Sequence, residues 1–150
     1  MASHYTIQRR VEFSDTDMAG IMHFSNFFRF METAEHAFLR SLGFSVVMRM
    51  TDPPVGWPRV HCECDYHKPV HFEDILVVHL KVLKKSNRSL TYGFDFHIDS
   101  APDELVARGL IVAACVTRDS ESGRMKAIPI PEMISQAIEV FNHSDTTMIK

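Results

Sequence analysis

The sequence predicts an α+β fold in which one long helix packs against an antiparallel sheet. One segment near the N-terminus has helical spacing, several strand-like segments follow a proline-rich connection, and short turns join those segments. Strands joined by short turns mostly pair antiparallel, and a long apolar helix needs a sheet to cover it. With 150 residues, 45% of them hydrophobic and 23% charged, the chain is expected to form a single domain over residues 1–150.

The first predicted element is a half-buried strand over residues 5–13, where polar and apolar residues alternate. Arg9 is the one charged residue on its apolar side. The next segment, Ser14–Gly20, is rich in hydrogen-bonding side chains and ends in a glycine that can adopt positive φ. We therefore expect a structured loop between the strand and the helix.

The helix is predicted over Phe24–Leu42, and Gly43 is suited to closing it in the left-handed conformation. Its aromatic content indicates burial over most of its circumference. The apolar residues that recur every three or four positions are Phe24, Phe27, Phe28, Met31, Ala34, Phe38 and Leu42.

Residues 51–58 contain three prolines and predict a turn-rich connection. Four strands are expected beyond it, and a short amphipathic helix is expected to begin at Pro131 and reach Phe141. The third strand alternates cleanly, whereas the fourth is apolar on both sides and is expected in mid-sheet with packing on each face. The predicted strands cover residues 59–67, 75–84, 89–99 and 105–118.

Charge and composition exclude several classes of function. The 16 Lys and Arg against 19 Asp and Glu give a net charge of −3, with no basic stripe for nucleic acid. The longest apolar stretch, Leu110–Val116, is far shorter than the ~20 residues of a membrane span, and no secretory signal is recognisable. Three cysteines form an odd set, which favours reduced thiols and a cytoplasmic location.

The segment Asp15–Phe24 combines residues that could carry chemistry. It places two carboxylates, a glycine and the start of the long helix within ten residues. A helix start offers free N–H donors to a developing oxyanion, and a carboxylate can attack a carbonyl or activate water. The alternative is that Asp15 and Asp17 only cap turns before the helix.

Residues 12–30, EFSDTDMAGIMHFSNFFRF, strongly resemble the opening of the 4-hydroxybenzoyl-CoA thioesterase family of hotdog-fold proteins. The likeness continues through Pro69–Asp74, Arg88–Leu90 and Ile128–Pro129. The resemblance implies a long helix wrapped by a curved antiparallel sheet, and a homodimer or a dimer of dimers with its sites at the subunit interface. It also implies an acyl-CoA substrate and no cofactor, because coenzyme A is part of that substrate.

The resemblance also implies roles for individual residues. Asp17 matches the family's catalytic carboxylate, Gly20 belongs to the substrate-binding loop, and the backbone N–H of Phe24 would polarise the thioester carbonyl. Many relatives have Tyr or His at or beside this last position, whereas this chain has His23 followed by Phe24. A phenyl ring cannot donate a hydrogen bond, so only the backbone role carries over to Phe24, and His23 is a candidate for a polar contact.

Coenzyme A carries phosphates, and the family binds them near the start of the strand at Arg88 and Ser89 and at the preceding turn. Lys84 and Lys85 are the further cations at that turn. An ordinary solvated turn is the alternative, because charged residues are common at strand ends.

A metal site is conceivable on the strand 59–67, but its spacing argues against one. Its four polar residues share one face yet spread over about 20 Å at 3.3 Å per residue, so one ion could reach only adjacent members. A polar sheet face or a dimer interface is the preferred interpretation, and no metal is expected. The residues concerned are His61, Glu63, Asp65 and His67, with Cys62 and Cys64 on the other face and His71 nearby.

Glu32 and Glu35 are rival carboxylates, because a second hotdog thioesterase lineage has its catalytic Glu on this helix. Here they are expected to be partly exposed and to pair with Arg29 or His36 at helical spacing.

The favoured function is hydrolysis of an aromatic or a short- to medium-chain acyl-CoA, with Asp17 as general base or nucleophile. The acyl group would lie against the Phe-rich helix and Trp57 or Pro58. A non-catalytic module that binds acyl thioesters or acyl carrier protein is the first alternative, although a carboxylate beside the thioester would disfavour a pure binder. A hotdog dehydratase is the second, since fold alone does not fix function.

Overall fold

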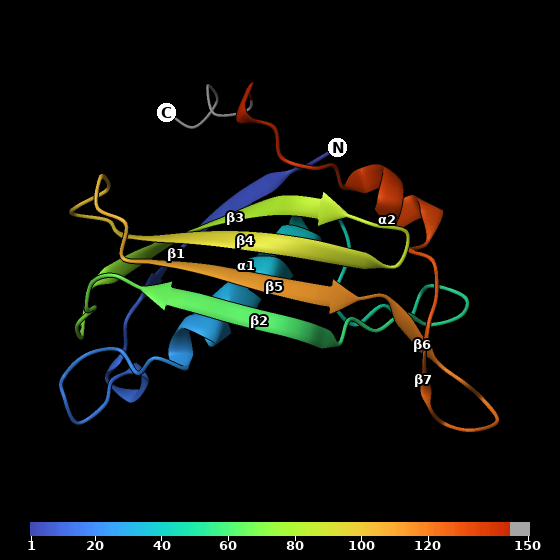
Figure 1. Cartoon of the computed structure of the whole chain (residues 1–150), viewed down its shortest axis with the longest axis horizontal. Coiled ribbons are helices and arrows are strands. Elements are labelled where there is room, and N and C mark those ends of the chain that lie inside the picture. The colour runs from blue at the N-terminus through green and yellow to red at the C-terminus, as the bar shows by residue number, and fades with distance from the viewer. Residues whose placement is uncertain (145–150) are drawn as a thin grey trace.

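The computed structural model describes residues 1–144, in which a five-stranded antiparallel sheet curves around one long helix (Figure 1). The sheet has the strand order β1–β3–β4–β5–β2, and the helix α1 (Asn26–Ser41) crosses one of its faces. This is the α+β architecture that the sequence predicts. The strands are β1 (His4–Arg10), β2 (Arg59–Tyr66), β3 (Ile75–Lys85), β4 (Ser89–Ile98) and β5 (Ala107–Ala114).

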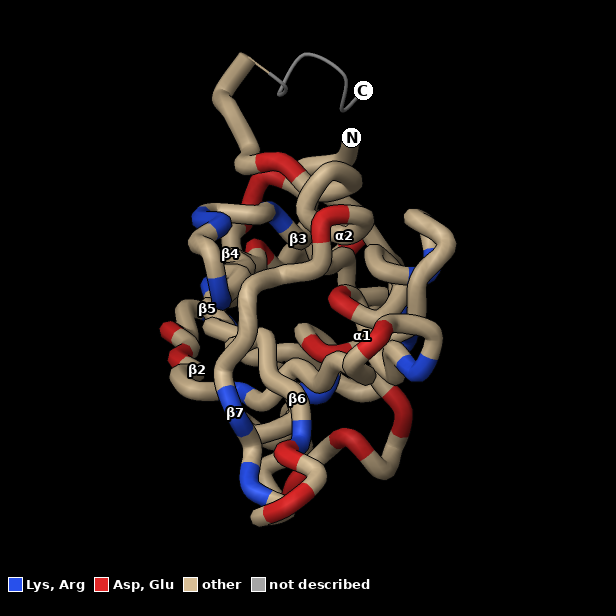
Figure 2. The backbone as a smooth tube through the Cα atoms, turned by 90° about the vertical axis from the view of Figure 1, so that its right-hand side faces the viewer, with Lys and Arg blue, Asp and Glu red and all other residues tan. Residues whose placement is uncertain are grey.

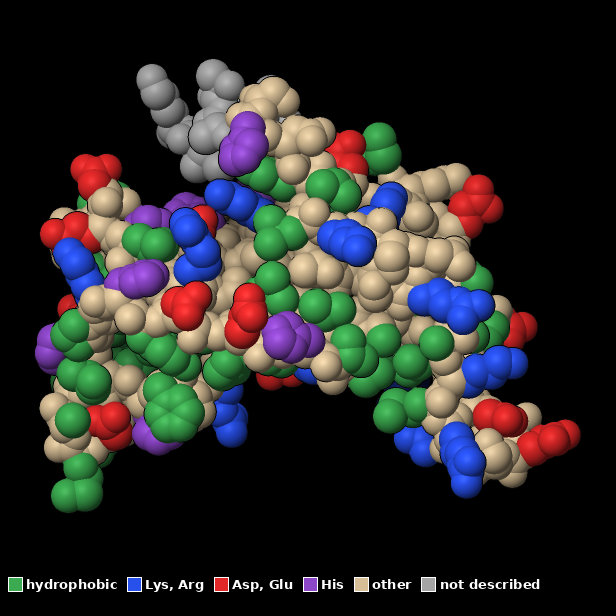
Figure 3. Space-filling model, in the orientation of Figure 1, with side chains coloured by type: hydrophobic (Ala, Val, Ile, Leu, Met, Phe, Trp, Pro, Cys, Tyr) green, Lys and Arg blue, Asp and Glu red, His purple; other side chains and the backbone are tan. Residues whose placement is uncertain are grey.

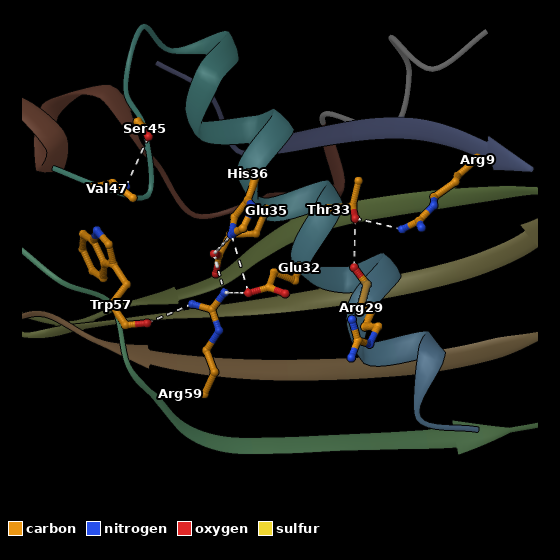
Figure 4. A network of polar contacts seen from close by, with 10 residues as sticks. All are labelled: Arg9, Arg29, Glu32, Thr33, Glu35, His36, Ser45, Val47, Trp57 and Arg59. Carbon is orange, nitrogen blue, oxygen red and sulfur yellow. Dashed lines mark hydrogen bonds and ion pairs between the residues drawn. The ribbon is translucent and has the colours of Figure 1, made fainter. Parts of the chain in front are cut away.

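The first strand ends at Arg10, three residues before the expected limit. The chain turns because the backbone N–H of Glu12 donates to Asp15 Oδ2 at 2.9 Å, which closes a short 3-10 turn over Phe13–Asp15. Arg9 stays on the apolar side of the strand, where its guanidinium lies 4.2 Å from the centre of the Phe30 ring. A hydrogen bond of 3.1 Å to Thr33 Oγ1 completes its contacts with α1 (Figure 4). Packing against an aromatic ring explains a charge at this position.

The helix α1 is amphipathic, so the expected burial over most of its circumference is wrong. Its buried residues face the sheet, while Arg29 and Glu32 on the far side are exposed. The helix begins at Asn26 rather than Phe24, and Phe24 itself is 63% exposed. Gly43 closes the C-terminal end with φ 84°, as predicted.

The strand β4 alternates as predicted. Leu90, Tyr92, Phe94 and Phe96 are buried against the helix side. The predicted position of β5 inside the sheet is confirmed, but the expected packing on both of its faces is wrong, because its outward residues are only half-buried or exposed. Figure 3 views this outer face, where hydrophobic, acidic, basic and histidine side chains are mixed.

The predicted fourth strand, 105–118, is divided at Cys115, whose side chain is fully buried. Beyond it, β6 (Val116–Arg118) pairs with β7 (Met125–Ala127) in a separate two-stranded sheet. No pattern in the sequence predicts β7. The last helix, α2 (Glu132–Ala137), is shorter than the predicted 131–141.

Figure 2, turned by 90°, shows α1 and the sheet as two layers, with acidic and basic positions interspersed along the chain. None of the helices in residues 1–144 has both the length and the apolar composition needed to cross a bilayer.

Candidate active site

Asp15 organises the loop that precedes the helix. Its carboxylate accepts the N–H of Glu12, and its carbonyl oxygen accepts the backbone N–H of His23 at 2.9 Å. The same carbonyl accepts Asn26 Nδ2 at 2.7 Å, so the first residue of α1 is held to the loop. Asp15 is only 8% exposed, and its hydrogen bonds stabilise the loop. The turn-capping alternative therefore describes Asp15 well.

Asp17 occupies a different environment in the same loop. It is half-buried, and its Oδ1 accepts the N–H of Ala19 at 2.8 Å, while Oδ2 has no partner within residues 1–144. The N–H of Gly20 donates to the Asp17 carbonyl at 3.0 Å, and Gly20 has φ 77°, which a glycine adopts without strain. The tight turn fixes the Asp17 carboxylate and leaves one oxygen available for other partners.

The backbone N–H of Phe24 donates no hydrogen bond within the described residues. The peptide that contains it is nevertheless fixed, because the His23 carbonyl accepts the N–H of Asn26 at 2.9 Å. A fixed, unpaired N–H at the start of a helix is a suitable donor to a carbonyl oxygen that gains negative charge.

Asp17 and Phe24 line the same pocket, which has a volume of about 440 Å³. Its walls are largely apolar and come from the loop, the start of α1, the end of β2 and the segment that follows β2. The lining residues are Asp17, Ile21, Met22, Phe24, Phe27, Tyr66, His67, Lys68, Pro69 and Val70. The structure thus places Asp17 and Phe24, the residues predicted to supply the carboxylate and the N–H donor, at one cavity.

His23 does not line this pocket. Its Nδ1 lies 2.7 Å from Ser25 Oγ, and its ring stacks on the Phe24 ring with the centroids 4.6 Å apart. In this structure His23 supports the turn before the helix.

The predicted CoA-binding residues lie at the β3–β4 turn, at the opposite end of the sheet from the Asp17 loop (Figure 1). Within one chain, the structure does not bring the two groups together. Lys84 and Arg88 are exposed, and Ser89 Oγ lies 2.6 Å from Ser86 Oγ. Lys85 is engaged, since its Nζ donates to the carbonyls of Ser135 and Ile138, each at 2.8 Å.

The rival carboxylates on α1 belong to an ion-pair network at the other end of β2 (Figure 4). Glu35 is 1% exposed, so its expected partial exposure is wrong, and it pairs with Arg59 at 2.7 Å rather than with Arg29. Glu32 is exposed and lies 3.7 Å from both His36 and Arg59. Neither glutamate lines the Asp17 pocket.

Trp57 also lies away from that pocket. It is 7% exposed, and its Nε1 donates to Met48 Sδ at 3.4 Å. Of the Phe-rich segment, Phe24 and Phe27 line the cavity, whereas the rest of the segment, Trp57 and Pro58 do not.

The polar residues of β2 do not gather around a point. Glu63 and Asp65 face the outer side of the sheet, where they line a separate recess, and His61 Nε2 lies 3.2 Å from Glu63 Oε2. Residues 1–144 hold no group of three or more His, Cys, Asp or Glu side chains suited to a metal ion.

Two residues that fix the start of the helix have no role in the sequence predictions. Asn26 fixes the helix start, and the Tyr66 hydroxyl donates to the Phe24 carbonyl at 2.9 Å. Tyr66 is separated from Phe24 by 42 residues, so no local pattern in the sequence reveals that contact. Asn26 lies two residues after Phe24 in the same motif, and its side-chain amide, a hydrogen-bond donor, is the feature of the sequence that indicates this contact.

Comparisons with known proteins agree on the family. A sequence model of the thioesterase superfamily matches residues 19–104. A putative esterase from Aquifex aeolicus is 37% identical over 90 residues, which cover 60% of this chain and 70% of that protein. A 1,4-dihydroxy-2-naphthoyl-CoA hydrolase from Parasynechococcus marenigrum is 30% identical over 140 residues, which cover 89% of this chain and 88% of that protein.

Among solved structures, a 1,4-dihydroxy-2-naphthoyl-CoA thioesterase from Synechocystis superposes with a TM-score of 0.79 at 25% identity. The match covers 89% of this chain and 94% of the other. The fold expected from the resemblance of residues 12–30 is thereby confirmed. On its sequence and on its fold, this chain belongs to the thioesterase superfamily.

Proposed function

We propose that the protein is an acyl-CoA thioesterase that converts an aromatic or a short- to medium-chain acyl-CoA to the free acid and CoA. The observation that supports the proposal is that Asp17 and Phe24, whose N–H has no partner within residues 1–144, both line one largely apolar pocket. Relatives named for hydrolysis of 1,4-dihydroxy-2-naphthoyl-CoA support an aromatic acyl group in particular.

In the first proposed route, Asp17 acts as a general base. Its free oxygen takes a proton from water, the water oxygen bonds to the thioester carbon, and the carbonyl oxygen becomes an oxyanion that accepts the N–H of Phe24. Collapse of this intermediate breaks the C–S bond, and the thiolate of CoA receives the proton from Asp17. Only water is consumed, so the reaction needs no cofactor.

In the second route, Asp17 acts as a nucleophile. The carboxylate oxygen bonds to the thioester carbon, the C–S bond breaks, and a mixed anhydride and the CoA thiolate result. Water then splits the anhydride into the free acid and the Asp17 carboxylate, and the remaining proton goes to the CoA thiolate. Both routes use the same two groups, so the arrangement of the site accommodates either.

We further propose that the active unit is a homodimer joined along β2. This strand is at the edge of the sheet, most of its residues are exposed, and Val60 is 62% exposed. An unpaired edge strand is a template for pairing with another chain. A two-fold axis at this edge would bring the partner's β3–β4 turn to the same end of the joined sheet as Asp17. That arrangement would let Lys84, Arg88 and Ser89 bind the nucleotide part of CoA.

Size-exclusion chromatography with light scattering tests the dimer, and Val60→Glu near the start of β2 should produce monomers. A monomeric wild-type protein would contradict the arrangement. A dimer of dimers is a further expected assembly, and the same measurement would detect it.

The three free cysteines support a cytoplasmic location.

Turnover of purified protein on benzoyl-, 4-hydroxybenzoyl-, hexanoyl- and decanoyl-CoA tests the proposed activity. Products should be separated by chromatography, because thiol reagents also react with the cysteines. Asp17→Asn should lower kcat at least about 100-fold, whereas the matched variant Asp103→Asn, on an exposed turn, should retain activity. Thioesters that bind but survive would overturn the proposal and favour a non-catalytic binding module.

Single turnover in ¹⁸O-labelled water tests the nucleophilic route. Nucleophilic attack followed by hydrolysis at the Asp17 carbon leaves ¹⁸O in that side chain, which mass spectrometry of the peptide detects. Label found only in the released acid agrees both with the general-base route and with attack of water on the acyl carbon of the anhydride.

A further inference from the structure

Tyr66 links the end of β2 to the start of α1. Its ring packs edge-on against Phe27, with the centroids 5.1 Å apart, and Phe27 packs in turn against Phe96 at 5.3 Å. The hydroxyl donates to the carbonyl of Phe24 at 2.9 Å. The side chain is thus held by its ring, and its polar end reaches the residue that bears the unpaired N–H.

The Phe24 carbonyl is available because the helix does not use it. The N–H of Phe28, which would normally bond to this carbonyl in a regular helix, donates to Ser25 at 3.2 Å instead. The hydroxyl of Tyr66 therefore satisfies a carbonyl that the first turn leaves free.

The two peptide groups on either side of the Phe24 Cα are then both fixed. In the preceding peptide, the His23 carbonyl accepts the N–H of Asn26. In the following peptide, the Phe24 carbonyl accepts the Tyr66 hydroxyl, and the N–H of Ser25 donates to His23 Nδ1 at 3.3 Å. The only group of these two peptides without a partner within residues 1–144 is the N–H of Phe24.

We propose that Tyr66 is a positioning residue that orients the Phe24 N–H toward the thioester carbonyl. The inference rests on the proposed function, because it assigns a role to Tyr66 in that reaction. Donors that stabilise an oxyanion must be aligned before charge develops, so a displaced donor loses part of its effect on the transition state. Tyr66 contributes no proton to the reaction and acts through the backbone of residue 24.

The ionisation of Tyr66 agrees with this role. Burial, and then the neighbouring Cys64 thiol, raise the pKa of Tyr66 to about 12. The hydroxyl therefore remains a donor throughout the range in which the enzyme would be assayed. Tyr66→Phe should accordingly lower activity equally at every pH and add no limb to the pH–rate profile.

The test compares Tyr66→Phe with Tyr5→Phe, which also removes one phenolic hydroxyl but lies outside the pocket. With benzoyl-CoA as the probe, Tyr66→Phe should lower kcat about tenfold with KM changed less than twofold, and Tyr5→Phe should resemble wild type. A kcat within twofold of the Tyr5→Phe value, or a change confined to KM, would overturn the inference. If the wild-type protein itself does not turn over any of the acyl-CoA substrates, the proposed function is refuted instead.

A spectroscopic measurement separates positioning from a general loss of stability. In Asp17→Asn, which retains the thioester, infrared spectra of bound ¹³C-carbonyl benzoyl-CoA should show the carbonyl stretch at lower frequency than in free solution. Adding Tyr66→Phe should return part of that shift, and adding Tyr5→Phe should not. The signal comes only from folded protein with bound ligand. If adding Tyr66→Phe to Asp17→Asn leaves the carbonyl stretch unchanged, the inference is overturned, even if Tyr66→Phe lowers the melting temperature.

Discussion

The Arg59 guanidinium and the Glu35 carboxylate form an ion pair between β2 and α1, with Nη2 and Oε1 2.7 Å apart. Arg59 also donates from Nη1 to the Trp57 carbonyl at 2.9 Å. Glu35 Oε2 is buried and has no partner within the described residues. The pair thus joins the edge strand to the helix through a carboxylate that only partly recovers its lost hydration.

Arg59→Met should destabilise the fold by about 3–5 kcal/mol, because it leaves the Glu35 carboxylate buried without its counter-charge. Urea denaturation followed by circular dichroism measures the change. The double variant Glu35→Gln, Arg59→Met should recover most of the loss, since it removes both charges. Equal stability of the single and double variants would contradict this account.

The stability difference between wild type and Glu35→Gln should depend on pH. Burial raises the pKa of Glu35, although Arg59 opposes the shift. The folded state therefore holds the proton more tightly than the unfolded state, and this contribution is fully present below the unfolded pKa and is lost as pH rises through the folded pKa. Unfolding free energies between pH 4 and 8 should move against wild type as pH rises. A constant difference would contradict the prediction.

Arg88 and Lys85 should respond differently to substitution. Arg88→Ala should raise KM for acyl-CoA roughly tenfold, the equivalent of one charge-assisted contact of about 1.4 kcal/mol. It should leave KM for the matching acyl-pantetheine unchanged, because that substrate lacks the nucleotide. Lys85→Met should chiefly lower the melting temperature, because Lys85 donates to the carbonyls of Ser135 in α2 and of Ile138 directly after it. An equal effect of Arg88→Ala on both substrates would exclude a nucleotide contact.

Gly109→Ala should destabilise the protein by about 1–3 kcal/mol. An added Cβ would lie 2.0 Å from Met31 Cε and 2.6 Å from its Sδ, so the buried Met31 side chain must move. Gly56→Ala is the matched control, since its Cβ meets only Val116 Cγ2 at 3.7 Å. Thermal unfolding compares the two, and equal melting temperatures would show that Met31 adapts without cost.

Sequence periodicity predicts the burial of an element correctly when one of its faces is covered along the element and the other is not. The alternation of β4 matches its burial because one of its faces packs against α1, where Tyr92 contacts Phe38 and Phe96 contacts Phe27. The apolar run of β5 was misleading, because residues such as Leu110 lie on an outer face that other elements leave partly open. Element ends depended on hydrogen bonds of single residues, such as the one from Glu12 to Asp15 that ends β1 early.

The candidate site was predictable only where its parts are close in sequence. Asp17, Gly20 and Phe24 belong to one motif, and their loop is stabilised by local hydrogen bonds. Tyr66 reaches Phe24 from the far end of β2, and Arg59 reaches Glu35 across the fold. Contacts of this kind follow from the register of the sheet, which periodicity does not specify.

The unpaired donor of residue 24 belongs to the main chain, which has a consequence for protein engineering. The identity of the side chain at this position can be varied to reshape the mouth of the pocket without deleting the donor, because every amino acid except proline supplies the same N–H. The 63% exposure of Phe24 leaves room for such changes. In the proposed reaction, substrate scope and oxyanion stabilisation would therefore be separable at a single residue, and an amide-to-ester replacement of the backbone would remove the second while preserving the first.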